Sequence, residues 1–169
     1  MALVLGNGFV RGRKDAGFIP VRAALGSTMI YHGLSKLKEE ENRKQAGQMF
    51  EQIGIRPGRP LAIATGIAEV FAGVSAVLGF LTRPAALAVL VTQAVAIAKV
   101  HAKKGFDITQ GGFEYNLALM AIATSLLLAG PGVFSLHEQL ERLAEGRGPK
   151  RVLRRARPNA LLRVIKLVK

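Results

Sequence analysis

A single carboxylate, Glu69, interrupts an otherwise uncharged stretch at residues 60–82. A stretch of that length can cross the hydrocarbon core of a bilayer as an α-helix, which needs about 20 residues. A carboxylate at that depth is costly unless it is protonated or paired, so intramembrane acids are rare and mark sites of function or assembly. Glu69 is therefore the first candidate for chemistry, either as a proton carrier or as part of a ligand site.

Helical spacing places Glu69 among small residues. Positions 62, 66, 69, 73 and 76 read Ala, Gly, Glu, Gly and Ala, so they share one face of a helix. Helices in a bilayer pack through such faces, which directs Glu69 into the protein and away from lipid. Arg22 and His32, on the stretch 16–37, are its candidate partners. Glu69 and His32 are also the candidate proton-handling residues, since a carboxylate beside a histidine can exchange protons with a ligand.

Several polar residues are expected near the same end of the protein, where they would form a pocket for a small ligand or a lipid head. The candidate pocket residues are Arg22, His32, Lys36, Glu69, His101 and Glu114. Simpler roles stay open for most of them. Glu69 and Arg22 could form a structural clamp between helices, while Arg22 and Lys36 could mark the ends of a span. His101 could cap its helix at the interface, and Glu114 suits a helix N-terminus.

Composition narrows the choice of cofactor. The sequence has no cysteine, which excludes disulfides, thiolate-bound metals and iron–sulfur clusters. His32 and His101 are expected at similar depth, but two isolated histidines are weak evidence for axial haem ligation, so haem is not expected. No metal site is expected either.

Four apolar stretches predict an all-α fold, an integral membrane four-helix bundle. The predicted spans are 16–37, 60–81, 84–100 and 113–130. The short turn at Thr82-Arg83 makes the second and third spans an antiparallel hairpin. A soluble bundle is disfavoured because these stretches lack the polar face of a surface helix. The loop 38–58 predicts a short polar helix with one apolar edge that lies across the membrane face.

The chain divides into an N-terminal cytoplasmic tail (1–15), a membrane domain (16–137) and a basic cytoplasmic tail (138–169). The net charge is +13, and residues 142–169 hold ten Lys or Arg against one acid. Clustered cations without interleaved aromatic residues favour anionic lipid headgroups over nucleic acid. From Asn159 onward the pattern suits an in-plane amphipathic helix, with a disordered lipid-binding tail as the alternative.

Four spans put both termini on one side of the membrane. That side carries fourteen Lys or Arg against nine on the other, which favours cytoplasmic termini in the inner (plasma) membrane of a bacterial cell. The opening apolar run at residues 2–10 is too short to span and precedes its basic cluster. No signal peptide is therefore expected.

Several motifs resemble those of the DoxX family of membrane proteins, over about residues 16–137. They are Arg22-Ala-Ala-Leu-Gly26, His32-Gly-Leu-Ser-Lys36, Gly66-Ile-Ala-Glu69, Gly79-Phe-Leu-Thr82-Arg83, Gly111-Gly-Phe-Glu114-Tyr115 and Gly130-Pro-Gly132-Val-Phe-Ser135-Leu136. The family commonly has Asp after the final Ser-Leu, whereas this chain has His137. A role for a carboxylate at that position is therefore not expected here.

The resemblance implies a four-span bundle and, by analogy, a link to quinones, so a quinone is the cofactor that we consider for the pocket. The family takes its name from a subunit associated with a quinone-linked oxidoreductase of sulfur metabolism, and its members resemble partners of soluble redox enzymes or of other membrane subunits. We therefore expect a small integral subunit of a redox membrane complex, not catalytic alone, which anchors partners or forms homo-oligomers. The alternative is a non-catalytic scaffold held by the Glu69–Arg22 pair. A transporter is disfavoured because neither broken helices nor a repeat is evident.

Overall fold

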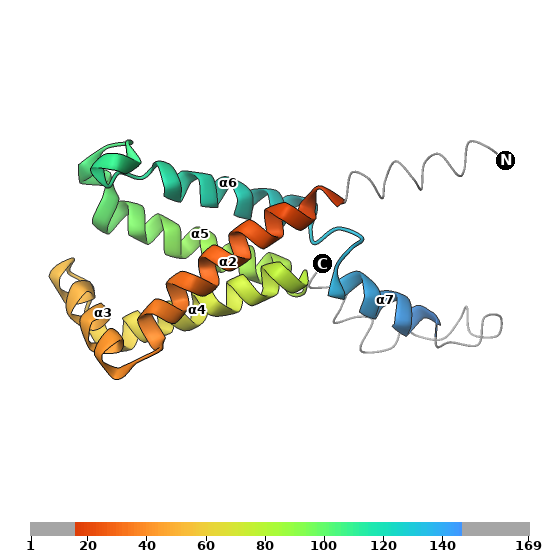
Figure 1. Cartoon of the computed structure of the whole chain (residues 1–169), viewed down its shortest axis with the longest axis horizontal. Helices are drawn as coiled ribbons and strands as arrows, with labels where there is room; N and C mark the ends of the chain where they lie inside the picture. Colours follow the sequence, from red (N-terminus) through yellow and green to blue (C-terminus); the bar gives the residue numbers. More distant parts are fainter. Residues whose placement is uncertain (1–15, 147–169) are drawn as a thin grey trace.

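The computed structural model describes residues 16–146, and helices make up most of this part of the chain (Figure 1). The α-helices are α2 (Phe18–Leu37), α3 (Glu40–Gln52), α4 (Gly58–Leu78), α5 (Thr82–Ala96), α6 (Glu114–Ala129) and α7 (Leu136–Gly146). Between α5 and α6 come a π-helical turn, η1 (Ile97–His101), and two 3-10 turns, η2 (Ala102–Lys104) and η3 (Ile108–Gln110). The all-α prediction is confirmed. The predicted tail at residues 1–15 and the in-plane helix after Asn159 lie outside the described residues.

The closest helix pair in the bundle is α2 and α4, which run antiparallel with glycines at their contact. Gly33 lies against Gly66, where an added Cβ on Gly33 would come within 2.6 Å of the Gly66 carbonyl oxygen. Gly73 lies against Gly26, where its Cβ would come within 2.7 Å of the Gly26 carbonyl oxygen. Real Cβ atoms do not approach an oxygen so closely, so only glycine fits at these points. The predicted small-residue face of α4 is thus confirmed as a packing face.

Helices α5 and α6 complete the bundle. The turn after α4 uses left-handed backbone at Gly79 and Leu81, and α5 then returns along α4. The predicted hairpin is therefore confirmed, although α5 starts at Thr82 and takes Pro84 into its first turn, where the missing N–H costs nothing. The core side chains are Leu25, Met29, Val89, Leu119 and Leu126, each at most 4% exposed.

The outer surface of the bundle is apolar. Ile67 on α4, Val91 on α5 and Leu128 on α6 are 57%, 62% and 75% exposed. Two of the described helical segments, Gly58–Leu78 and Thr82–Lys104, are long and apolar enough to cross a membrane. Helix α6 is apolar but shorter, and α2, with its three basic side chains, is not among the candidate spans.

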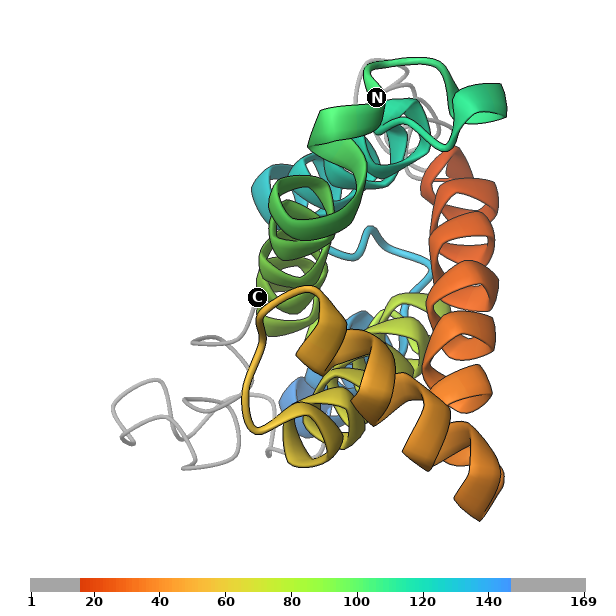
Figure 2. The same cartoon turned by 90° about the vertical axis from the view of Figure 1, so that its left-hand side faces the viewer.

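The two ends of the bundle differ in what closes them. Helix α3 lies across the end formed by the last turn of α2 and the first turn of α4 (Figure 2). Its buried residues are Gly47 and Phe50, which confirms the predicted polar helix with one apolar edge. Helix α7 lies at the opposite end, which is the end where α2 begins (Figure 1). An even number of passes along the bundle therefore separates the start of α2 from α7.

Candidate functional site

Glu69 pairs with Lys36, the last basic residue of α2. The Lys36 Nζ atom lies 2.7 Å from Glu69 Oε2 and also donates to the His32 carbonyl oxygen at 3.0 Å. Both side chains are largely shielded, at 17% and 7% exposure. The long lysine stem reaches back from the end of α2 toward the middle of α4, as lysines near helix ends can do. The predicted pairing of Glu69 with Arg22 is therefore wrong.

Arg22 lies at the other end of the bundle, where it binds backbone carbonyls. Its Nε donates to Ala76 O at 2.9 Å and its Nη2 to Val77 O at 2.7 Å. Its Nη1 donates to Pro131 O and Phe134 O, at 3.0 and 2.7 Å. The last carbonyls of a helix lack intrahelical partners. Arg22 thus caps α4 and holds the segment after α6, and it takes no part in the pocket predicted for it.

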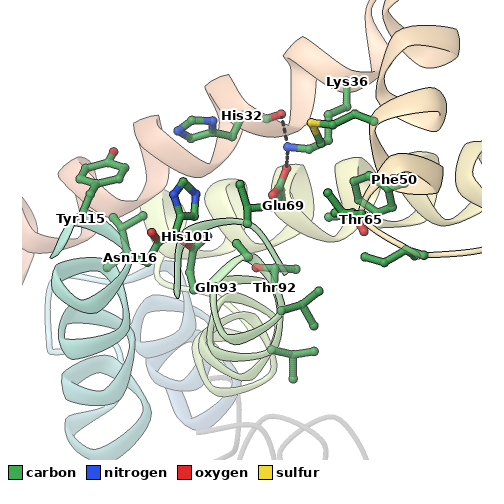
Figure 3. A pocket seen from close by; sticks show the side chains of 18 of the residues that line it. His32, Lys36, Phe50, Thr65, Glu69, Thr92, Gln93, His101, Tyr115 and Asn116 are labelled. Carbon is green, nitrogen blue, oxygen red and sulfur yellow. Dashed lines mark hydrogen bonds and ion pairs between the residues drawn. The ribbon is translucent and has the colours of Figure 1, made fainter. Parts of the chain in front are cut away.

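A cavity of about 600 Å³ lies beside the Lys36–Glu69 pair (Figure 3). Helices α2 to α6 and the segment between α5 and α6 all contribute to its wall. Its larger apolar side chains are Met49, Phe50, Ile53, Ile55, Val91, Val95, Val100, Ile108 and Leu119. Its polar and ionisable side chains are His32, Lys36, Thr65, Glu69, Thr92, Gln93, His101, Tyr115 and Asn116. Mostly apolar walls with a few polar groups, in a volume of about 300–1,000 Å³, are typical of small-molecule sites.

Two buried amides form one polar wall of the cavity. Asn116 Nδ2 on α6 donates to Gln93 Oε1 on α5 at 2.8 Å, and Gln93 Nε2 lies 3.9 Å from Met29 Sδ. Tyr115 on α6 donates its hydroxyl to Thr28 Oγ1 on α2 at 3.3 Å. Sequence reasoning did not place Asn116 or Tyr115 in the site. Their signal was present, because each is a polar side chain at the start of an apolar helix.

His101 presents a hydrogen-bond acceptor to the cavity. Its Nδ1 lies 2.7 Å from the Gly111 carbonyl oxygen, which can only accept. Nδ1 therefore carries a proton, so the tautomer that fits this contact has its lone pair on Nε2. In Figure 3 the His101 ring stands beside Glu69, on the side of the cavity toward Tyr115. A hydroxyl group on a ligand could donate to this nitrogen.

The structure brings together four of the six predicted pocket residues: His32, Lys36, Glu69 and His101 all line the cavity. Glu114 does not; its Oε2 accepts the backbone N–H of Ile108 at 3.3 Å. Within residues 16–146 no group of three or more His, Asp or Glu side chains is arranged to hold a metal ion.

Charged groups outside the bundle hold the segments that cover the cavity. Glu40 on α3 pairs with Arg43 at 3.0 Å and with Arg59 at the start of α4 at 2.5 Å. The hydrogen bond from Arg43, and then the charge of Arg59, lower the pKa of Glu40. In the segment before α6, Asp107 accepts the backbone N–H and the hydroxyl of Thr109, both at 2.8 Å. These bonds from Thr109 lower the pKa of Asp107.

Comparison with known proteins identifies the family of this chain. Residues 17–102, just over half of it, match the DoxX family. The chain belongs to the DoxX family. It is also similar to an uncharacterized membrane protein, Rv3486, of Mycobacterium tuberculosis, with 29% identity over 143 residues that cover 78% of this chain and 86% of the relative. No solved structure matches the chain. This DoxX protein is thus a membrane protein, and Lys36, Glu69 and His101 all lie within the residues that match the family.

Proposed function

We propose that this DoxX protein is a small subunit of a redox membrane complex that binds a quinone beside Lys36 and Glu69. In this proposal α2, α4, α5 and α6 cross the inner (plasma) membrane, and both termini face the cytoplasm. The exposed apolar side chains on α4, α5 and α6 support a lipid environment. The position of α7 at the same end of the bundle as the start of α2 supports an even number of spans (Figure 1). The excess of cations in the tails supports the orientation.

The observation that carries the proposal is the ion pair set into the wall of a mainly apolar cavity. Lys36 uses two of its three N–H groups, on Glu69 and on the His32 carbonyl, which leaves one for a ligand oxygen. Glu69 Oε1 has no hydrogen-bond partner among the described residues. A quinone head has two carbonyl oxygens on an apolar ring, so a lysine donor within apolar walls suits it.

Proton handling follows from the same groups. Reduction of a quinone takes up two electrons and two protons, and a partner subunit would supply the electrons. Glu69 can exchange a proton with a ligand at Oε1, because Lys36 contacts only Oε2. His101 Nε2 accepts a hydrogen bond from a hydroxyl, which suits the reduced ligand. The side chains of this protein would then bind the head, orient it and exchange its protons.

The test is quinone-dependent turnover of the native complex in a Glu69→Gln variant. We expect the variant to assemble normally and to lose most of its turnover, because an amide of similar shape cannot exchange the proton. Glu114→Gln is the matched control, since Glu114 is also an acid on an apolar helix but lies off the cavity. Natively extracted wild-type protein should also retain quinone, measured by extraction and chromatography. Unchanged turnover in Glu69→Gln would remove the carboxylate from the mechanism.

A non-catalytic scaffold is the second candidate, and the same ion pair favours it. Lys36–Glu69 joins α2 to α4, so it could serve only to hold the helices together. In that case Glu69→Gln should lower the yield of folded protein rather than the turnover of protein that has assembled. Partner or anionic-lipid docking would then fall to the basic tail at residues 149–169, which lies outside the described residues.

A further inference from the structure

The cavity has an apolar side that reaches the surface of the bundle. Met49 on α3 and Val95 on α5 line the cavity, yet each is 43% exposed. Val91, one turn before Val95, also lines it and is 62% exposed. Side chains that belong both to a cavity wall and to the outer surface mark an opening. This opening lies between α3 and the second half of α5.

The opposite side of the cavity is built differently. There Tyr115 on α6 donates to Thr28 on α2, so a hydrogen bond joins the two helices across the gap. Within residues 16–146 no hydrogen bond or ion pair links α3 to α5. In Figure 3, Phe50 lies on one side of Glu69 and Tyr115 on the other. Ile108 and Tyr115 on that opposite side also line the cavity and are 50% and 39% exposed, but there the Tyr115–Thr28 hydrogen bond spans the gap between the helices. The side toward α3 is therefore the exposed side that polar contacts leave open.

The position of the opening decides what it faces. Val91 and Val95 lie within Thr82–Lys104, one of the two segments apolar enough to cross a membrane. Their exposed faces are aliphatic, as are Ile53 and Ile55 along the neighbouring wall. A passage for a water-soluble solute would need polar groups at its mouth, whereas an aliphatic mouth at this depth faces acyl chains.

We propose that the opening between α3 and α5 admits the apolar tail of the ligand sideways from the bilayer. The ligand is then a membrane-resident amphiphile, with its head at Lys36 and Glu69 and its tail leaving past Met49 and Val95. This inference rests on the proposed quinone site and adds the route of access and the need for a tail. Thr92 and Ala96, which also line the cavity, connect the head position to the opening.

The experiment compares two probes that share one benzoquinone head, with either a methyl or a decyl substituent. Their binding is measured on the purified full chain in lipid nanodiscs, for the wild type and for Val95→Trp. An indole at Val95 narrows the opening and leaves the head position free. We expect decyl-probe affinity to fall about tenfold, which is about 1.4 kcal/mol, and methyl-probe affinity to stay within about twofold.

Val74→Trp is the matched control. Val74 on α4 is 42% exposed, nearly the same as Val95, but it does not line the cavity. It should change neither probe. Retained methyl-probe binding shows that Val95→Trp is folded. Equal loss of both probes, or no loss of either, overturns the sideways route while the quinone site stands. Absence of binding of both probes to the wild type overturns the quinone site and the route together.

Discussion

Two cations of α2, the buried Arg22 and the partly buried Lys36, make different contacts at the two ends of the bundle. Arg22 donates hydrogen bonds to four backbone carbonyls, which belong to α4 and to the segment after α6. Lys36 instead meets a carboxylate at the wall of a cavity and keeps one donor for a ligand. A planar guanidinium suits fixed carbonyls around it, whereas an ammonium on a flexible stem suits a site where contacts change. The contacts of Arg22 therefore suit a rigid end of the bundle, and under the proposed function those of Lys36 suit a ligand that enters and leaves.

Replacing Arg22 should cause the largest effect. Arg22→Met removes the donors of four carbonyls, of which those of Ala76 and Pro131 are buried, and each unmet buried group costs about 1–3 kcal/mol. We expect about 2–6 kcal/mol of lost stability. Arg22→Lys should recover little of it, because an ammonium cannot reach four carbonyls in two segments. Thermal unfolding in detergent, followed by circular dichroism, measures both variants. A fully stable Arg22→Lys protein would contradict the rigid role of the guanidinium.

Gly33→Ala tests whether the close approach of α2 and α4 holds Lys36 beside Glu69. The added methyl would meet the Gly66 carbonyl oxygen, so the helices must separate there. We expect a loss of about 1–3 kcal/mol, typical of overpacking, together with weaker quinone binding as Lys36 moves from Glu69. Gly17→Ala is the control, because Gly17 is exposed and has a helical φ of −61°. Unfolding and probe binding are measured on both proteins.

A double-mutant cycle should measure the interaction energy between Lys36 and Glu69. Lys36→Met leaves the shielded Glu69 carboxylate without its cation, whereas Lys36→Met with Glu69→Gln removes both charges. We expect the double variant to be more stable than Lys36→Met alone, with a coupling energy of about 0.5–3 kcal/mol. The same double variant should fail to bind the quinone probes. Additive effects on unfolding would mean that the two side chains do not interact.

The sequence predicts the helices well because their signals are local. Apolar length, glycine spacing and the Thr82-Arg83 turn each act within one or two helices. The partner of Glu69 depends instead on the register between α2 and α4. That register was readable, since Gly26 and Gly33 are seven residues apart, as are Gly66 and Gly73. Antiparallel pairing of these glycines sets Arg22 beside the end of α4 and leaves Lys36 for Glu69.

Other parts of the site could not be read from the chain. The Gln93–Asn116 contact depends on how α5 and α6 pack, and no spacing rule relates the two residues. The proton position on His101 depends on the fold of the segment that carries Gly111. Both features arise from tertiary contacts between segments whose local patterns show only that they are helix or turn.

The smallest expected effect concerns Glu40, whose ion pair with Arg59 joins α3 to α4 at the Lys36 end of the bundle. Its pKa is lowered from an ordinary value of 4.5, first by the hydrogen bond from Arg43 and then by the charge of Arg59. A lowered pKa in the folded protein gives stability that is present above pH 4.5 and is lost as the pH falls through the folded value. Glu40→Gln should therefore be slightly less stable than the wild type near neutral pH. The difference should close on acidification, as unfolding midpoints at several pH values can show.

Glu41→Gln serves as the control for that comparison. Glu41 is the neighbouring acid on α3, and its Oε1 accepts only from Gln45. It forms no ion pair with Arg43 or Arg59, so its removal should not change the pH dependence. Glu40→Gln also tests whether α3 moves when the ligand tail enters. If α3 moves, the variant should bind the decyl probe faster, while the head of the probe binds as tightly as before. Unchanged association rates would mean that entry of the tail needs no movement of α3. The side chains of Met49 and Val95 alone would then set the width of the opening.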